Sequence, residues 1–181
     1  MNTYELTTQD EQATTPELKP ISLAAIPRSL EKAERYRLIN QPWAAESICL
    51  DILRAEPANQ RALHILVLAL TDQFKGESGE LSKRAAAALE RIDSEYERAY
   101  YGGMILERRA TSKLASGAPG SGVIAYDWVR AAMERYEAAE RLRPPGNDDS
   151  LLRWNSCVRM LEAHPELKPA PSERMEPVLG E

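Results

Sequence analysis

The sequence predicts an all-α protein of about seven helices. Apolar residues recur three and four positions apart in seven successive stretches, which is the spacing of one face of an α-helix. No stretch alternates apolar and polar residues for long enough to predict a β-strand. Proline, glycine and asparagine separate the stretches, so the connections are short. Helices joined in this way form either an α-solenoid or a helical bundle.

The first four predicted helices fill the first half of the chain. The first spans about 27–40, and the second spans 43–55 and is followed by a proline. Asn59 is a suitable N-terminal cap for the third helix, which ends before two glycines. The fourth helix spans about 81–92. Each has one apolar face, as expected for helices that pack against their neighbours.

The last three predicted helices fill the second half of the chain. Ser94 and Glu97 have the spacing of a capping box at the start of the fifth helix. The fifth helix runs from there to the segment 115–122, which reads ASGAPGSG and predicts a mobile loop. The sixth helix spans about 123–143, and the seventh spans about 149–163. The glycine-rich loop is therefore the one long internal connection that we expect.

The composition predicts one globular domain with two acidic ends. The chain has 181 residues, of which 43% are hydrophobic and 28% charged, with a formal net charge of −5. Residues 1–20 contain four acidic residues and one lysine, and we expect a disordered leader there. The helical domain spans 21–163. Residues 164–181 contain four prolines and predict a disordered tail.

Charge and hydropathy exclude several classes of protein. No basic face is evident, which argues against nucleic-acid binding, and the apolar stretches are too short to span a membrane. Residues 1–20 lack a basic start and an apolar core, so they do not form a signal peptide. Cys49 and Cys157 have no metal-ligand or disulfide spacing, and neither a metal nor a cofactor is expected. We therefore expect a cytoplasmic protein.

Two pairs of predicted helices share the same pattern of small, aromatic and proline residues. In the first pair this pattern is formed by Ala33, Tyr36, Ala45, Cys49 and Pro57. In the second pair it is formed by Gly102, Ile105, Ala132, Tyr136, Ala139 and Pro144. This pattern resembles the tetratricopeptide repeat, a pair of antiparallel helices of about 34 residues. The resemblance covers about 26–163 and implies three degenerate repeats plus a terminal helix.

The resemblance implies a right-handed α-solenoid of antiparallel helix pairs. The first helix of each pair in such a solenoid lines a concave groove, which is the usual binding surface. The residues that this register places in the groove are Arg37, His64, Asp72, Tyr96, Tyr100, Glu107, Asn155 and Arg159. A helical bundle without repeats, which would use the same alanines and tyrosines as ordinary core, is the alternative fold.

These expectations favour a scaffold or adaptor that binds a peptide or a helix of another protein. Tyr96 and Tyr100 are the expected anchors, although an aromatic pair four residues apart also occurs as ordinary packing. Catalysis is not expected, because His64 has no nucleophile or carboxylate at the spacing of a catalytic triad.

Two alternatives from other classes remain open. One is a regulatory subunit or small helical enzyme with a pocket between the loop 115–122 and Tyr96, Tyr100 and Arg108. The other is a self-associating structural module that forms a homo-oligomer. This alternative requires the terminal helix to expose an apolar strip, for which Trp154 and Val158 are the candidate residues.

Overall fold

The computed structural model describes residues 16–75 and 78–170. These residues form a short 3-10 helix, η1 (Leu23–Ala25), and seven α-helices: α1 (Ile26–Leu38), α2 (Pro42–Ala55), α3 (Gln60–Thr71), α4 (Gly79–Leu89), α5 (Glu95–Ala115), α6 (Ser121–Leu142) and α7 (Asp149–Ala163). No strand occurs in the described residues, and the prediction of an all-α fold with about seven helices is confirmed.

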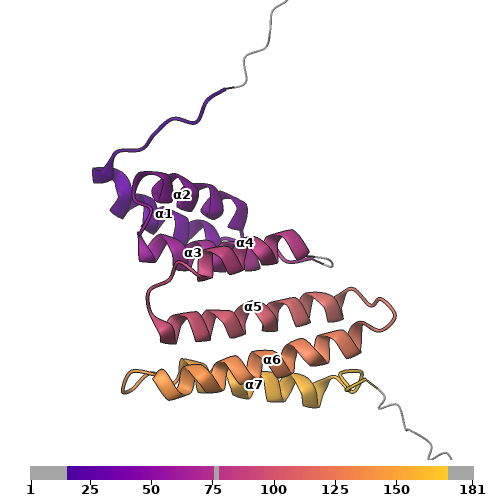
Figure 1. The fold of residues 1–181 in the computed structure, drawn as a ribbon. Coiled ribbons are helices and arrows are strands. Elements are labelled where there is room, and N and C mark those ends of the chain that lie inside the picture. Colours follow the sequence, from indigo (N-terminus) through magenta and orange to yellow (C-terminus); the bar gives the residue numbers. More distant parts are fainter. Residues whose placement is uncertain (1–15, 76–77, 171–181) are drawn as a thin grey trace, which may run out of the picture.

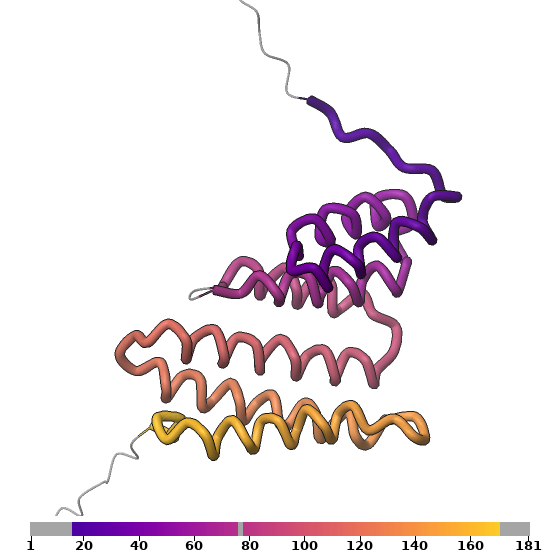
Figure 2. The backbone as a smooth tube through the Cα atoms, turned by 180° about the vertical axis from the view of Figure 1, so that it is seen from behind, coloured from indigo at the N-terminus to yellow at the C-terminus, as the bar shows by residue number. Residues whose placement is uncertain are grey.

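The helices are arranged as a stack that follows the chain. Each helix packs against the next one in sequence, and the stack runs from α1 and α2 at one end to α6 and α7 at the other (Figure 1). The view from behind shows the same order (Figure 2). Beyond these neighbours, α1 also contacts α3, and α3 also contacts α5. These two contacts bring alternate helices of the first five together along one side of the molecule.

Local sequence signals explain where the helices begin. Proline occupies the first turn of both α1 and α2, where its missing N–H needs no partner. The Asn59 side chain accepts a hydrogen bond of 2.9 Å from the backbone N–H of Ala62 at the start of α3. Ser94 Oγ accepts one of 3.2 Å from the N–H of Glu97 at the start of α5. Asn59 and Ser94 therefore cap their helices as predicted, but the Glu97 carboxylate lies 3.0 Å from His64 Nε2 and does not complete the capping box.

Two hydrophobic clusters form the core. The first gathers aliphatic side chains of α1 to α4 and also includes Ile105 of α5. The second lies among α5, α6 and α7 and contains Val129, Met133 and Tyr136. The free thiols Cys49 and Cys157 are buried, one in each cluster, and burial raises the pKa of each to about 12. Both cysteines therefore behave as small core side chains, as expected.

The ends of the helical region differ from the sequence expectation. The predicted leader lies outside the described residues up to position 15, and residues 16–20 are exposed. The predicted tail lies outside them from position 171, but Leu167 is buried against the second cluster. A Cβ atom at Gly122 would lie 2.3 Å from the carbonyl oxygen of Glu166, so this segment packs directly against α6. The packed part of the chain therefore extends past the expected boundary at Ala163.

The loop between α5 and α6 is shorter than expected. Only residues 116–120 connect the two helices, because α5 includes Ala115 and α6 begins at Ser121. Gly117 and Gly120 have φ values of 62° and 77°, which a residue with a Cβ adopts only under strain.

Among the described residues, none of the helices combines the length and the apolar content required to cross a membrane.

Candidate functional site

The side of the molecule where α1, α3 and α5 meet carries an ionic bridge between three helices. Arg37 Nε of α1 donates a hydrogen bond of 2.7 Å to Asp72 Oδ2, which follows the end of α3. Arg108 Nη1 of α5 approaches Asp72 Oδ1 at 2.5 Å. The same nitrogen contacts Thr71 Oγ1 at 2.5 Å and the Leu68 carbonyl oxygen at 3.2 Å. Asp72 is therefore shared between two arginines that belong to different helices.

The electrostatics of this bridge follow from partial burial. Burial lowers the pKa of the Arg108 guanidinium, and the neighbouring Asp72 carboxylate opposes that shift. One carboxylate between two guanidinium groups leaves an excess of positive charge. The bridge thus holds the two arginine side chains in place.

A row of aromatic rings continues from the bridge along α3 and α5. His64 stacks on Tyr101 with 5.3 Å between ring centroids, and Tyr101 meets the edge of Tyr100 at 5.2 Å. Tyr100 in turn stacks with Tyr96 at 6.0 Å. His64 Nε2 lies 3.0 Å from Glu97 Oε2 but lacks the geometry of a hydrogen bond. These five side chains and the arginine bridge constitute the α1–α3–α5 surface.

Burial favours the protonated hydroxyl groups of Tyr96 and Tyr101. Burial is the main cause that raises the pKa of Tyr101, to about 12, and it also raises the pKa of Tyr96. The Tyr96 hydroxyl contacts Asn147 Oδ1, in the turn between α6 and α7, at 3.1 Å. The rings thus offer neutral amphipathic groups rather than phenolates, and Tyr96 is already fixed at its tip.

Glu107 does not lie on this surface, although the sequence placed it in the groove. Its carboxylate is buried and accepts a hydrogen bond of 2.5 Å from the Tyr136 hydroxyl of α6. Arg153 Nη1 of α7 lies 3.3 Å from the other carboxylate oxygen. Burial, and secondarily the Glu107 charge, raises the pKa of Tyr136 well above its ordinary value. Glu107 therefore ties α5, α6 and α7 together inside the molecule.

The two remaining expected residues, Asn155 and Arg159, lie exposed on α7. Neither makes a hydrogen bond or an ion pair within the described part of the chain. Of the eight expected residues, the structure brings five together on the α1–α3–α5 surface: Arg37, His64, Asp72, Tyr96 and Tyr100. Glu107 is buried beneath that surface, since its partner Tyr136 lies 6.0 Å from the Tyr100 ring, and no contact joins Asn155 or Arg159 to the five within the described residues.

The predicted groove left out three members of the surface on α5, Glu97, Tyr101 and Arg108, and Arg108 was expected only in the alternative enzyme pocket. Their positions are four and seven residues apart, which places them on one face of a helix. That spacing was the available signal, but Glu97 is also a residue of the capping box, and Arg108 precedes a second arginine, as on an ordinary solvated face. Whether these residues belong to the surface or to an ordinary cap and solvated face depends on how α5 packs against α3.

A small cavity of about 340 Å³ adjoins the arginine bridge. It is lined by Thr71, Asp72, Phe74, Arg108, Thr111, Ser112 and Ala115. It contains Arg108 and the start of the predicted loop region, but Tyr96 and Tyr100 are not part of its wall. The hypothetical enzyme pocket combined all of these groups, and the structure does not bring them into one cavity. No group of three or more potential metal ligands is found among the described residues.

The residues expected to form an apolar strip at the terminal helix are partly covered. Trp154 Nε1 donates a hydrogen bond of 3.1 Å to Glu137 Oε1, and Val158 packs against the second cluster. Leu152 of α7 is nonetheless 64% exposed. Three further apolar side chains are exposed near the turn between α1 and α2: Leu38 is 85% exposed, Ile39 56% and Trp43 66%. Exposed apolar side chains therefore occur at both ends of the helix stack.

Comparisons with models of protein families, with curated proteins and with solved structures found no match to this chain. Function must therefore be argued from the geometry of the α1–α3–α5 surface.

Proposed function

We propose that this protein is a binding scaffold, a right-handed α-solenoid of tetratricopeptide-like helix pairs that holds a segment of another protein. Two features support the repeat architecture. The small residues of the repeated pattern, including Ala33, Ala45, Ala132 and Ala139, are fully buried, which suits close approach of paired helices. The contacts of α1 with α3 and of α3 with α5 are those that the first helices of successive pairs make in a solenoid.

The observation that carries the proposal is the continuous row formed by His64, Tyr101, Tyr100 and Tyr96. Partly exposed aromatic side chains flanked by arginine are the composition of energetic hot spots in protein interfaces. Stacking fixes the rings before a partner arrives, so binding loses little side-chain entropy. A surface prepared in this way suits an extended peptide or one face of a helix.

The chemistry of the partner follows from the two ends of the row. The arginine bridge at one end has an excess of positive charge and favours an acidic group. The Tyr96–Tyr100 stack at the other end favours an apolar or aromatic side chain. The mechanism is binding by shape and a few anchors, without a catalytic step. A cytoplasmic location is part of the proposal, because both thiols are free.

Site-specific crosslinking tests the proposal directly. A photoreactive phenylalanine analogue is placed at Tyr96 in one variant and at Ile124, an exposed position at the other end of α5–α6, in a second. After crosslinking in cells, we expect a partner to be trapped at position 96 and not at position 124. A Tyr100→Ala substitution in the first variant should abolish that crosslink without loss of helical circular dichroism. Identical crosslinks at both positions, or no dependence on Tyr100, would contradict the proposal.

A further inference from the structure

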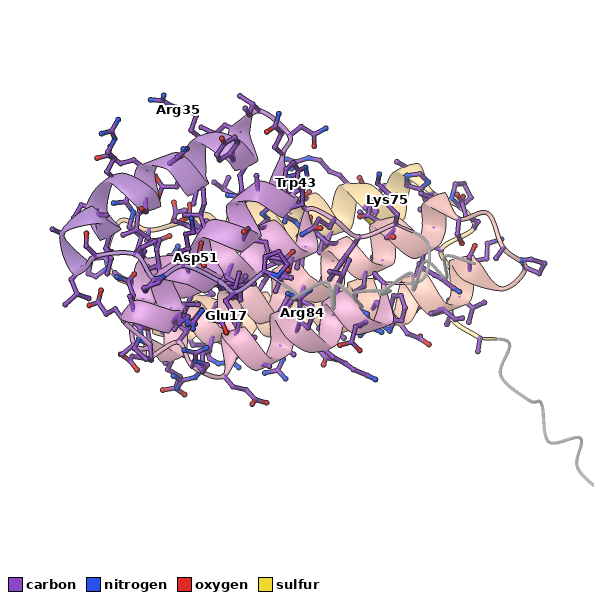
Figure 3. The ribbon with its side chains drawn as sticks, turned by 90° about the horizontal axis from the view of Figure 1, so that it is seen from above. Glu17, Arg35, Trp43, Asp51, Lys75 and Arg84 are labelled. Atoms are coloured by element: carbon purple, nitrogen blue, oxygen red, sulfur yellow. The ribbon has the colours of Figure 1, made fainter. Side chains whose placement is uncertain are left out.

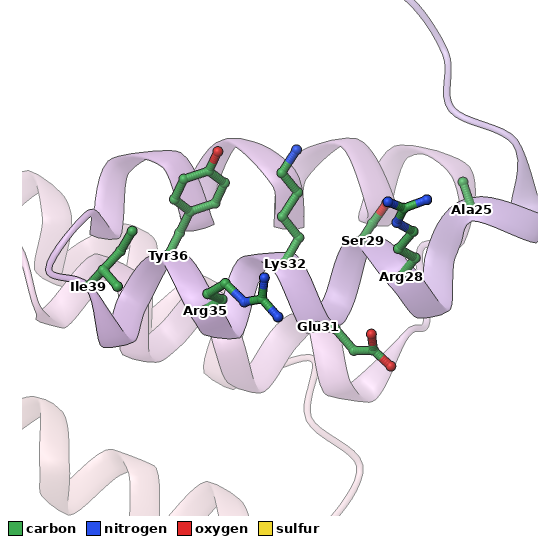
Figure 4. A pocket seen from close by; sticks show the side chains of 8 residues that line it. All are labelled: Ala25, Arg28, Ser29, Glu31, Lys32, Arg35, Tyr36 and Ile39. Carbon is green, nitrogen blue, oxygen red and sulfur yellow. The ribbon is translucent and has the colours of Figure 1, made fainter.

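The outer face of α1, which points away from the core, carries three cations within two turns. Arg28, Lys32 and Arg35 line an open trough of about 590 Å³, together with Tyr36 and Ile39 (Figure 4). Lys32 Nζ lies 5.8 Å from the centroid of the Tyr36 ring. The trough thus combines positive charge with an aromatic ring and an aliphatic side chain, and none of it belongs to the α1–α3–α5 surface.

Interactions within α1 account for only part of this charge pattern: Arg35 lies in the last turn, where the helix dipole favours a cation, but Arg28 and Lys32 gain no such stabilisation. Arg28 lies in the first turn, where the positive end of the helix dipole disfavours a cation. Lys32 lies four residues from Arg28 and three from Arg35, so like charges face each other along the helix. Glu31 is the one acidic residue that lines the trough.

The cations of the trough also differ from other arginines nearby. Arg37 is paired with Asp72, and Arg61 is paired with Glu34 through two hydrogen bonds of 2.9 and 2.8 Å. Neither Arg28 nor Arg35 has a carboxylate partner within the described residues. Glu34 and Arg37 of α1 therefore have partners within the protein, whereas Arg28, Lys32 and Arg35 are exposed and accessible to an external group.

One end of the trough leads to the exposed apolar side chains of the α1–α2 turn. Ile39 lines the trough itself, and Leu38 and Trp43, one and four residues away from it in the chain, are largely exposed but do not line the trough. Figure 3 shows Arg35 projecting from the edge of this α1–α2 end of the molecule. Because the apolar group lies at one end of the row of cations, a ligand would bind in one orientation, with its charges along α1 and its apolar residue at the turn.

The charge pattern argues against a second copy of this chain as the occupant. If two copies paired α1 with α1 about a two-fold axis through the middle of the trough, Arg28 of one copy would lie opposite Arg35 of the other. Only Glu31 and Lys32 would then attract each other. The net repulsion favours an occupant of opposite charge.

We propose that the outer face of α1 and the adjoining turn bind an acidic helical segment of a partner protein. Its carboxylates are spaced four and three residues apart and meet Arg28, Lys32 and Arg35. A large apolar side chain follows and packs against Ile39 and Trp43. The protein then has two separate interaction surfaces, and this one is independent of the aromatic row.

Selection from a display library of short random peptides tests the proposal without a known ligand. The bait is the full chain, and the selected peptides are then measured by fluorescence anisotropy against three proteins. These are the wild type, the charge-reversed variant R28E/K32E/R35E, and the control variant R54E/K83E/R141E, which reverses three exposed cations elsewhere. Circular dichroism establishes that both variants are folded.

We expect selected peptides to be rich in Asp and Glu and to contain a large apolar residue. Charge reversal of the trough should raise their Kd by about tenfold or more, while the control variant should change it much less. Trp43→Ala should weaken the same peptides. Selection without acidic enrichment, or equal binding to both triple variants, would overturn the proposal.

Two further outcomes would replace the proposed partner by the chain itself. A synthetic peptide of residues 1–15 that binds as tightly as the selected peptides would identify the acidic leader as the occupant. A dimer in sedimentation equilibrium that Trp43→Ala dissociates would identify a second copy. A monomer that does not bind the 1–15 peptide, together with acidic selected peptides, supports the partner.

Discussion

The two halves of the helix stack are stabilised by different kinds of contact. In α1 to α4 the buried members of the core cluster are aliphatic side chains and one cysteine. In α5 to α7 the cluster surrounds a polar centre, where Tyr136 and Arg153 contact the buried carboxylate of Glu107. The first half depends on burial of apolar area, which tolerates some rearrangement, and the second combines such burial with one hydrogen-bonded arrangement of defined geometry.

The candidate surface lies where these two halves meet. Ile105 of α5 belongs to the first cluster, and Arg108 reaches back to the end of α3. His64 of α3 stacks on Tyr101 of α5. The side chains proposed to bind a partner are thus also the ones that couple the halves, so a partner bound there would stabilise their relative position.

Truncation of the aliphatic core should have the largest effect. Leu63 is fully buried in the first cluster, and Leu63→Ala should lower the free energy of unfolding by about 2–5 kcal/mol because it leaves a cavity. Urea unfolding is followed by circular dichroism and by tryptophan fluorescence, with Trp43 of the first half replaced by phenylalanine so that Trp128 and Trp154 of the second half give the fluorescence signal. If the halves are coupled, both signals shift to lower urea together.

The matched control for this substitution is Leu50→Ala. Leu50 is 46% exposed on α2, and its truncation should change stability by less than about 0.5 kcal/mol. A shift in circular dichroism for Leu63→Ala with an unchanged fluorescence midpoint would show that the second half unfolds independently. The halves α1 to α4 and α5 to α7 would then be two separate folding units and not one coupled unit.

Two adjacent glycines of α5 test how tightly the second half is packed. A Cβ atom at Gly103 would lie 2.6 Å from Cε1 of the fully buried Tyr136 ring. Gly103→Ala should therefore destabilise the protein by about 1–3 kcal/mol, because the ring has no space into which to move. Thermal unfolding measures the change.

Gly102→Ala is the control at the neighbouring position. The nearest atom to a Cβ at Gly102, apart from its own helix, is Leu89 Cδ2 at 3.5 Å, an ordinary contact. Alanine there should stabilise α5 by about 0.5–1 kcal/mol, since glycine is the poorer helix former. Equal effects at both positions would mean that the Tyr136 ring adapts and that the second half is less constrained than its contacts indicate.

Local sequence signals predicted the helices correctly but predicted only part of the candidate site. Caps such as Asn59 and Ser94 act on backbone groups two or three residues away, so their effect is readable in the sequence. Glu107 is different, because its partners lie 29 and 46 residues away on other helices. Whether a charged residue of α5 faces solvent or Tyr136 depends on how α5 rotates between α3 and α6, and periodicity alone does not determine that rotation.

The buried thiols predict a loss of stability at alkaline pH. Burial raises the pKa of Cys49 and of Cys157 from 9.0 to about 12. Above pH 9 the unfolded chain loses these protons while the folded chain retains them, so each thiol lowers stability by about 1.4 kcal/mol per pH unit up to about pH 12. Below pH 9 both states keep the protons, and the contribution is constant.

Single Cys49→Ala and Cys157→Ala variants assign this slope to the two halves. Urea unfolding at pH 8 and pH 10 should show a smaller pH-dependent loss in each variant than in the wild type, by about 1.4 kcal/mol. Because one thiol lies in each cluster, equal reductions indicate that the halves unfold as one unit. A reduction in only one variant would show that the other thiol is already accessible in the folded protein.

The ionic bridge should have the smallest effect on stability and the most direct effect on coupling. Asp72→Asn removes the charge that Arg37 and Arg108 share, and we expect a loss of about 0.5–1 kcal/mol at low salt that decreases as salt is added. Asp51→Asn on α2 is the control, because Asp51 forms no ion pair within the described residues. The bridge joins α5 to α3, so its loss should separate the urea midpoints of circular dichroism and tryptophan fluorescence in Asp72→Asn alone. Coincident midpoints in both variants would assign the coupling of the halves to Ile105 and the His64–Tyr101 stack, and would leave the arginines free to act in binding without a structural role.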